Sequence, residues 1–199
     1  MKSENKYIGD DKFQKFLEHY SCPTPLEIIR WRFAGSICSP NMELRPADVI
    51  SSLWENGQSP RLETKKEAEL FFQFFMGLWD EVFENIANNS LKLKKTQSSS
   101  NLIHLCESRY EEIEFGFVEG FWGGLEDAKL PAYVADIIDG LTSLSESYKK
   151  LVGKINPETD NKAIFDSVKK CDAMVEKTIS FLIENYVLPR INDLKRVVN

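Results

Sequence analysis

Apolar residues recur at helical spacing along most of the chain, and clear breaks divide them into separate segments. Thr24-Pro25-Leu26-Glu27 has the sequence of a capping box with proline at the first helical position. The helix that it predicts runs to about Ile37 and stops before Ser39-Pro40. Thr64-Lys65-Lys66-Glu67 repeats the capping-box sequence, and we expect the following helix to run to about Asn88. Polar side chains occupy only a narrow stripe of this second helix, which predicts that it is buried on most sides and forms the centre of the fold.

The remaining segments follow the same pattern. We expect shorter helices at about 12–20 and 46–54, and longer ones at about 103–128, 131–150 and 157–187, the last ended by Pro189. Strand signals are few. The main candidate for a strand in place of a helix is 115–122, where apolar and polar residues also alternate with a period of two. The stretch at about 89–101, rich in serine and lysine, predicts a mobile loop and not a domain boundary. We therefore predict an all-α fold over residues 1–199, a single-domain bundle of about seven helices with no significant sheet.

Glycines and aromatic residues are concentrated between Glu114 and Ala128, where four of the ten glycines fall within nine residues. Wound as a helix, this segment places its glycines on one stripe about 100° wide, beside an arc of aromatic and aliphatic side chains. These glycines are Gly116, Gly120, Gly123 and Gly124. Each glycine inside a helix costs about 1 kcal/mol relative to alanine, so a close neighbour must offset the loss. The pattern leaves open whether that neighbour is another helix of the same domain or a ligand or partner.

Acidic residues border the glycine stripe. Glu112, Glu119 and Glu126 are seven residues apart and stack along one side of a straight helix. We interpret them as a solvated border, with an exposed recognition surface as the alternative. Glu114 falls among apolar positions of the same helix, so it lies either at a frayed start or partly buried beside a cation.

The composition is that of an ordinary globular protein, with 42% hydrophobic and 28% charged residues. A net charge of −6 argues against a nucleic-acid partner, which would need a basic face. No apolar run is long enough for a membrane span, and the polar N-terminus predicts no secretory signal. Cysteine spacing suits neither a zinc ribbon nor a disulfide framework, so we expect a protein of the reducing cytoplasm. The cysteines are Cys22, Cys38, Cys106 and Cys171.

Residues able to carry out catalysis are scarce. His19 and His104 are the two histidines, and His104 and Cys106, two positions apart on one helix, point to different faces. The sequence contains no nucleophile elbow, P-loop or dinucleotide fingerprint, and it lacks the paired Glu-x-x-His units of a carboxylate-bridged metal site. We therefore predict no catalytic residue, no metal and no cofactor. The remaining enzyme hypothesis is a hydrolase or transferase with Glu119 or Glu114 as general base.

Two motifs resemble a known family. Pro25-Leu-Glu-Ile-Ile-Arg-Trp-Arg-Phe-Ala-Gly-Ser-Ile-Cys-Ser-Pro40 resembles the first helix and break of the YecA/YgfB-like family of bacterial proteins, and Phe117-Val-Glu-Gly-Phe121-Trp-Gly-Gly124-Leu resembles its second signature. The chain departs from the family pattern at Phe117, usually a tryptophan, and at Pro46-Ala-Asp-Val49, usually Pro-x-x-Trp. The cysteine-rich zinc tail of many members is also missing. The resemblance implies an all-helical cytoplasmic protein without an assigned reaction, and it carries over no metal site.

The acidic charge, the scarcity of catalytic groups and the close approach that glycine allows together predict a non-enzymatic protein-interaction or regulatory adaptor. Its predicted binding surface is an aromatic groove with an acidic border, made of Gly116, Glu119, Gly120, Trp122, Gly123 and Trp31. The alternative is a small-molecule-binding protein with a pocket between the 64–88 helix and the glycine-rich 115–128 helix. We expect the partner to be another protein, neither nucleic acid nor membrane, and aromatic residues on a helical surface are also compatible with a homodimer.

Overall fold

The computed structural model describes residues 6–54, 60–95, 101–125, 128–156 and 161–198. All regular structure in these ranges is helical and none of it is strand, so the predicted all-α fold is confirmed. The first half of the chain forms α1 (Asp10–His19), α2 (Leu26–Cys38), α3 (Pro46–Ser51) and α4 (Lys65–Ala87). The second half forms α5 (Leu102–Glu111), the π-helical turn η2 (Glu112–Val118), α6 (Glu119–Trp122), α7 (Ala132–Val152), α8 (Lys162–Leu182), the π-helical turn η3 (Ile183–Val187) and α9 (Leu188–Val198). Because α5–η2–α6 and α8–η3–α9 are each continuous, the described elements form seven helical segments.

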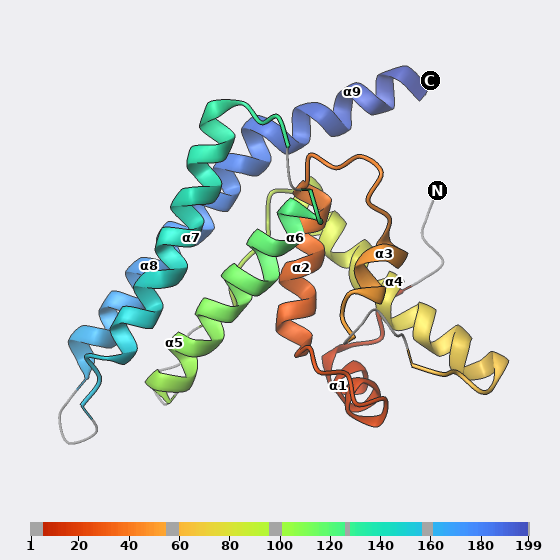
Figure 1. Cartoon of the computed structure of the whole chain (residues 1–199), viewed down its shortest axis with the longest axis horizontal. Helices are drawn as coiled ribbons and strands as arrows, with labels where there is room; N and C mark the ends of the chain where they lie inside the picture. Colours follow the sequence, from red (N-terminus) through yellow and green to blue (C-terminus); the bar gives the residue numbers. More distant parts are fainter. Residues whose placement is uncertain (1–5, 55–59, 96–100, 126–127, 157–160, 199) are drawn as a thin grey trace.

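The helix at the centre of the molecule is α2, which lies between two groups of helices (Figure 1). On one side it packs against α1, α3 and α4, and on the other it is crossed by η2 and α6. The helices α5, η2, α7 and α8 continue the packing on that second side, and α9 extends beyond the body of the molecule (Figure 1). The prediction that the 64–88 helix forms the centre and is buried on most sides is wrong. Phe72 and Phe83 of α4 are exposed, because α4 packs against α2 and α3 and, through aromatic rings, against α1, and these helices leave one side open.

Helix starts were predicted with mixed success, and hydrogen bonds explain the difference. At α4 the capping box forms: the Thr64 hydroxyl accepts the N–H of Glu67 at 3.1 Å, and the Glu67 carboxylate accepts the N–H of Thr64 at 3.2 Å. The box predicted at 24–27 does not form. The Thr24 hydroxyl donates instead to the carbonyl of Leu53 at 2.9 Å, and Pro25 precedes α2 without a side-chain cap. This hydrogen bond ties the start of α2 to the end of α3.

Three glycines allow α2 and η2–α6 to cross at very short distance. A β-carbon at Gly35 of α2 would lie 2.0 Å from the carbonyl oxygen of Phe117, and one at Gly120 would lie 2.3 Å from the carbonyl oxygen of Arg32. Gly116 faces α2 in the same way. The neighbour that the glycine stripe requires is therefore a helix of the same domain, and close backbone packing offsets the helix propensity that these glycines lose.

The other two glycines end this helix and do not belong to the stripe. Gly123 and Gly124 have φ angles of +51° and +76°, in the left-handed region that glycine adopts without a steric penalty. The helix therefore stops at Trp122, well before the predicted end near Ala128. Residues 126–127 lie outside the described ranges.

The prediction that Pro189 ends the last helix is also wrong, because α9 continues through it. In an α-helix the N–H of residue 189 would donate to the carbonyl of Asn185, but proline has no N–H. The Tyr133 hydroxyl of α7 donates to this carbonyl instead, at 3.4 Å. The π-helical turn η3 immediately precedes α9 and adjusts the backbone ahead of the proline.

The segment after α4 packs onto the second group of helices. Leu91 and Leu93 are buried, and the N–H of Leu93 donates to the carboxylate of Glu176 on α8 at 3.1 Å. These residues belong to the stretch 89–101, for which the sequence predicts mobility. Residues 96–100 of that stretch lie outside the described ranges, and its mobility stays a prediction.

Candidate functional site

An open cleft of about 620 Å³ lies where the end of α6 meets α2 and α3. It is lined by Arg32, Ser36, Leu44, Asp48, Val49, Ser52, Glu119, Gly120, Trp122, Gly123 and Gly124. The lining combines two carboxylates, an arginine and two hydroxyl groups with an indole ring and aliphatic side chains. Such a mixture of apolar surface and a few converging polar groups is typical of binding sites.

One wall of the cleft depends on the π-helical turn. In an α-helix the N–H of Glu119 would donate to the carbonyl of Phe115, but here it donates to the carbonyl of Glu114, five residues back. Arg32 of α2 donates to the Phe115 carbonyl from Nε at 3.1 Å and from Nη2 at 2.6 Å. Its Nη2 also lies 2.5 Å from Oε2 of Glu119. Arg32 thus fastens η2 to α2, and its charge is matched by Glu119.

Asp48 comes to the cleft from α3, where it forms a capping box with Arg45. Its carboxylate accepts the backbone N–H of Arg45 at 3.1 Å and two hydrogen bonds from the Arg45 guanidinium, both at 3.1 Å. The side-chain hydrogen bonds from Arg45, aided by the backbone N–H and by charge attraction, hold the pKa of Asp48 below its ordinary value. The carboxylate is therefore ionised at neutral pH, which suits it to attract a cation and not to accept a proton.

The carboxyl-terminal end of the α5–η2–α6 helix also contributes to the cleft, through Gly120, Trp122 and Gly123. Gly123 closes the helix by donating its N–H to the carbonyl of Glu119 at 3.0 Å. The carbonyl end of a helix carries partial negative charge, and the face of an indole ring attracts cations. Together with the Asp48 carboxylate, these groups make the cleft favourable for a positively charged ligand, while Glu119 balances the charge of Arg32.

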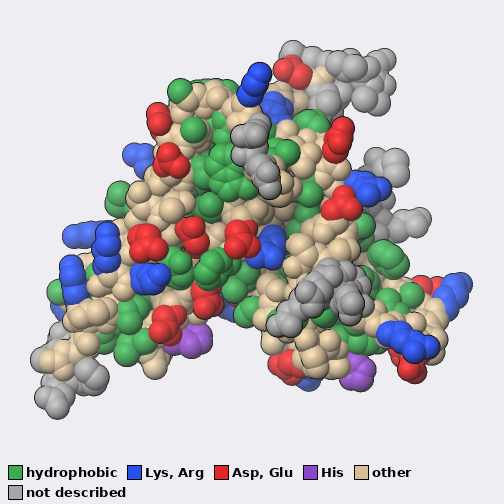
Figure 2. Space-filling model, viewed as in Figure 1, with side chains coloured by type: hydrophobic (Ala, Val, Ile, Leu, Met, Phe, Trp, Pro, Cys, Tyr) green, Lys and Arg blue, Asp and Glu red, His purple; other side chains and the backbone are tan. Residues whose placement is uncertain are grey.

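Acidic side chains are also prominent on the outer surface of this part of the molecule. Figure 2 shows them in a band across the middle of the visible face, over α5, α6 and the neighbouring α7. The whole chain carries a net charge of −6. A field of this sign draws basic groups toward the surface.

Four residues of the predicted binding surface line the cleft, namely Glu119, Gly120, Trp122 and Gly123. The other two are not available for binding. Trp31 is 2% exposed and packs edge-on against Phe117, with 6.3 Å between ring centroids, so the prediction that Trp31 belongs to the binding surface is wrong. Gly116 is buried against α2, and its prediction as binding surface is wrong for the same reason.

The predicted row of solvated glutamates is broken, because the wider π-helical turn shifts the residues that follow it. Glu112 is 5% exposed and binds Nη1 of Arg109 at 2.6 Å, whereas Glu119 is exposed at the cleft. Burial raises the pKa of Glu112 above its ordinary value, although the charge of Arg109 opposes the shift. Glu114 is half-buried beside a hydroxyl and not a cation, since it accepts a hydrogen bond from Ser145 at 2.8 Å. Glu126 lies outside the described ranges.

The histidines and cysteines of the described residues do not line the cleft. His19 and His104 are exposed and neither lines it. Cys38 and Cys106 are fully buried, and burial raises the pKa of these thiols to about 12 and about 11. Within the described ranges, no group of three or more His, Cys, Asp or Glu side chains is placed to hold a metal ion. The cleft thus offers charges, hydrogen-bonding groups and an aromatic surface, which are the means of binding.

A second, more apolar groove of about 220 Å³ adjoins the cleft. The two cavities meet at Ser36 and Leu44, which line both. The remaining lining residues of the groove are Ile37, Ser39, Asn41, Met42, Trp79, Phe83, Val187, Arg190 and Ile191. It therefore joins the loop after α2 to α4, η3 and α9, and no pattern in the sequence predicts it.

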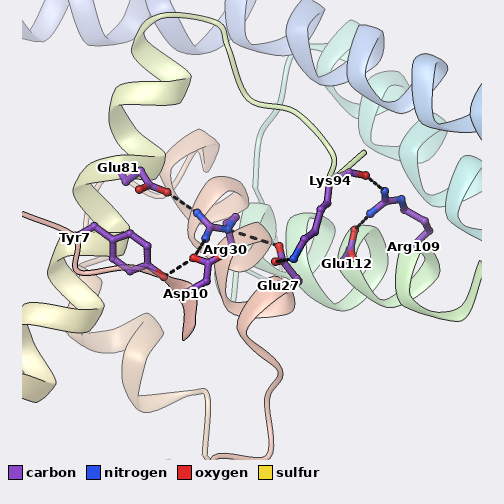
Figure 3. Close-up of polar contacts among 8 residues, drawn as sticks. All are labelled: Tyr7, Asp10, Glu27, Arg30, Glu81, Lys94, Arg109 and Glu112. Carbon is purple, nitrogen blue, oxygen red and sulfur yellow. Dashed lines mark hydrogen bonds and ion pairs between the residues drawn. The ribbon is translucent and has the colours of Figure 1, made fainter. Parts of the chain in front are cut away.

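A chain of ion pairs connects the helices on both sides of α2 (Figure 3). Arg30 of α2 lies 2.6 Å from Asp10 of α1, 2.6 Å from Glu81 of α4 and 3.6 Å from Glu27. Glu27 in turn lies 3.4 Å from the ammonium group of Lys94. These contacts hold the segment after α4 against the start of α2.

The chain continues from Lys94 to a buried cluster on α5 (Figure 3). The carbonyl of Lys94 accepts a hydrogen bond from Arg109, which is 2% exposed and also pairs with Glu112 and, at 3.2 Å, with Asp172 of α8. The Tyr148 hydroxyl of α7 donates to the same Asp172 carboxylate at 2.7 Å. The cluster links α5, α7 and α8. It has a structural role, since each of its charged or hydroxyl groups is bonded to another member of the cluster.

The described residues do not form the alternative pocket between the 64–88 helix and the glycine-rich helix, because α2 packs against both and lies between them. The cleft lies on the side of α2 that faces α3 and α6.

Comparison of the chain with protein-family models, with curated proteins and with solved structures found no match. The resemblance to the YecA/YgfB-like family therefore stays a prediction from its two motifs. Those motifs form α2 and η2–α6, the two helices that cross at Gly35 and Gly120. Within the described ranges, no helix combines the length and the apolar character that crossing a bilayer requires.

Proposed function

We propose that this protein is a non-enzymatic cytoplasmic adaptor or regulator that recognises another protein through the cleft between α2, α3 and α6. The observation that carries the proposal is the composition of the cleft lining. Ionised Asp48, the Arg32–Glu119 pair and the Trp122 indole provide specificity and apolar contact, whereas both histidines lie elsewhere.

Site-specific photocrosslinking tests this proposal. A benzophenone amino acid replaces Ser52, an exposed residue that lines the cleft, and the full-length protein is irradiated in the cells that produce it. The matched control carries the same group at Ser143, an exposed position of α7 outside the cleft lining. We expect one or a few discrete protein adducts from position 52 that position 143 does not give.

Adding Trp122→Ala to the position-52 protein should reduce the yield of these adducts, because the indole provides contact area in the cleft. Circular dichroism of the double variant verifies that it is folded. The proposal fails if position 52 gives no adduct, or if both positions give the same adducts.

A small-molecule ligand is the second candidate, and the cleft volume favours it. About 620 Å³ falls within the range of about 300–1,000 Å³ that holds metabolite-sized ligands. A screen of melting temperature against a metabolite library tests this candidate, since a ligand at a hundred times its Kd stabilises the native state by about 2.7 kcal/mol. A genuine ligand of the cleft should lose this effect in Trp122→Ala, whereas a screen without any shift rejects the candidate.

A further inference from the structure

The cleft and the adjoining groove offer two different chemistries side by side. Asp48 and Trp122 make the cleft favourable for a cation, and Glu119 balances the charge of Arg32. The groove, reached past Ser36 and Leu44, is lined mostly by apolar side chains. A single ligand that fills both must carry two unlike groups close together.

A basic group can reach the Asp48 carboxylate at little cost. Arg32 and Glu119 offset each other's charge, so Asp48 gives the cleft lining its excess of one negative charge. Arg45, the partner of Asp48, is 78% exposed, and an ion pair in contact with solvent contributes little to stability. A ligand cation can therefore share or replace Arg45 at the Asp48 carboxylate.

The groove has the features of an anchor site for an apolar side chain. Met42 and Phe83 beside it are 59% and 37% exposed, and Trp79 forms part of its wall. Large apolar side chains that are exposed together around a concave surface mark binding sites more often than single exposed apolar side chains do. Arg190 of α9 holds the rim of the groove in place by donating to the carbonyl of Ser39 at 3.1 Å.

We infer that the partner is a protein segment with one lysine or arginine and one large apolar residue, the basic side chain entering the cleft and the apolar side chain entering the groove. This inference rests on the proposed function and adds the chemistry of the segment that is recognised. A free polyamine would provide the cation without the apolar anchor, and a purely apolar peptide would fill only the groove.

The four tryptophans provide a direct test, because they report on different places. Trp122 lines the cleft and Trp79 lines the groove, whereas Trp31 and Trp54 are buried and line neither. The full-length protein is labelled with 5-fluorotryptophan, and each resonance is assigned by single replacement with phenylalanine. The probes are capped peptides of about ten residues in a serine–glycine background, with one lysine and one leucine at every spacing.

We expect peptides of a restricted range of spacings to shift the Trp122 and Trp79 resonances with one common Kd, and to leave the Trp31 and Trp54 resonances in place. Replacing the lysine by glutamate, or the leucine by serine, should weaken binding by about tenfold or more. Spermidine and a peptide with leucine but no lysine are the single-anchor probes, and each should bind at least about tenfold more weakly than the best two-anchor peptide.

Matched variants locate the two anchors. The double change Asp48→Asn and Glu119→Gln should weaken the best peptide, whereas Asp139→Asn on α7 should not. Phe83→Ser should weaken it as well, whereas Phe72→Ser, an exposed phenylalanine of the same helix outside the groove lining, should not. Circular dichroism and thermal melting of each variant separate loss of binding from loss of fold.

Each other result contradicts the inference in a distinguishable way. If peptides shift Trp122 alone, or if spermidine binds as tightly as the best peptide, the two-anchor segment is wrong. If no peptide shifts either resonance while position 52 still crosslinks to a protein, the proposed function stands and the inferred chemistry fails. If neither experiment gives a signal, both fail.

Discussion

At Gly35 the absence of a side chain allows two backbones to touch. A β-carbon there would lie 2.0 Å from the Phe117 carbonyl oxygen, and this backbone atom cannot rotate away. Gly35→Ala should therefore force α2 and η2 apart and lower the free energy of unfolding by about 3 kcal/mol. Urea denaturation followed by circular dichroism measures the change.

The control is Gly140→Ala on α7, where a β-carbon would have nothing within 4 Å. This change should raise the free energy of unfolding by about 0.5–1 kcal/mol, because alanine favours the helix over glycine. Equal effects of the two substitutions would show that the α2–η2 crossing is not close-packed.

Arg109 is a second residue whose removal should be costly, because it is 2% exposed and faces two carboxylates. Arg109→Met keeps an unbranched apolar side chain but leaves Glu112 buried without its countercharge. We expect a loss of about 3–5 kcal/mol at pH 7. The double variant with Glu112→Leu should recover part of that loss, since it removes the stranded charge.

The loss should depend on pH in a defined direction. Burial raises the pKa of Glu112 in the folded protein, so between its unfolded and folded pKa values the native state binds a proton that the unfolded state does not. Glu112 therefore destabilises the fold as pH rises through the folded pKa, and more strongly without Arg109. The difference in free energy of unfolding between wild type and Arg109→Met should shrink as pH falls from 7 toward the folded pKa of Glu112. A difference that grows as pH falls would contradict this account.

At the scale of elements, the π-helical turn η2 is stable because Arg32 occupies the carbonyl that the turn leaves free. Arg32→Met keeps the aliphatic stem but removes both donors to the Phe115 carbonyl and the pair with Glu119. Loss of these hydrogen bonds from a charged donor should lower the free energy of unfolding by about 1–3 kcal/mol. Arg45→Met, at a side chain that is 78% exposed, is the matched control and should have a much smaller effect. Similar losses of stability in both variants would argue against the stabilisation of η2 by Arg32.

The sequence predicts the helices well but not their irregularities. Apolar periodicity and the Thr64 capping box place the helical segments because these signals are local. The two π-helical turns have no local signature. They depend on groups from distant helices, Arg32 for η2 and Tyr133 for the helix that passes through Pro189. For the same reason the Thr24 hydroxyl bonds to Leu53 and not to its own helix.

At the scale of the whole molecule, the site could be predicted only in part. Glu119, Trp122 and Gly123 come from one dense motif, so the sequence points to them directly. Asp48 and Ser52 reach the cleft because α3 packs beside α2, and residues so far apart in the chain carry no pattern that links them to α6. Gly35 was the missed signal, since a small residue on α2 opposite the glycine stripe is what allows this crossing.

The attachment of α9 to the loop after α2 makes Cys38 a reporter of how the molecule opens. Arg190 donates to the Ser39 carbonyl at 3.1 Å and stacks over Tyr186, with 4.6 Å from its guanidinium carbon to the ring centroid. Cys38 beside this contact is fully buried, with its pKa raised to about 12. Arg190→Ala removes a charged hydrogen bond worth about 1.5–3 kcal/mol, so local opening and alkylation of Cys38 should increase about tenfold or more.

Cys106 provides the internal comparison, because it is equally buried but lies on α5. Alkylation of the native protein by iodoacetamide, quantified for each cysteine by mass spectrometry, should increase at Cys38 and stay unchanged at Cys106. The charge of Arg190 lowers the pKa of Cys38, so its removal alone would make this thiol less reactive. A faster reaction at Cys38 therefore measures opening and not chemistry. An equal increase at both cysteines would mean that α9 and the body unfold together as one cooperative unit.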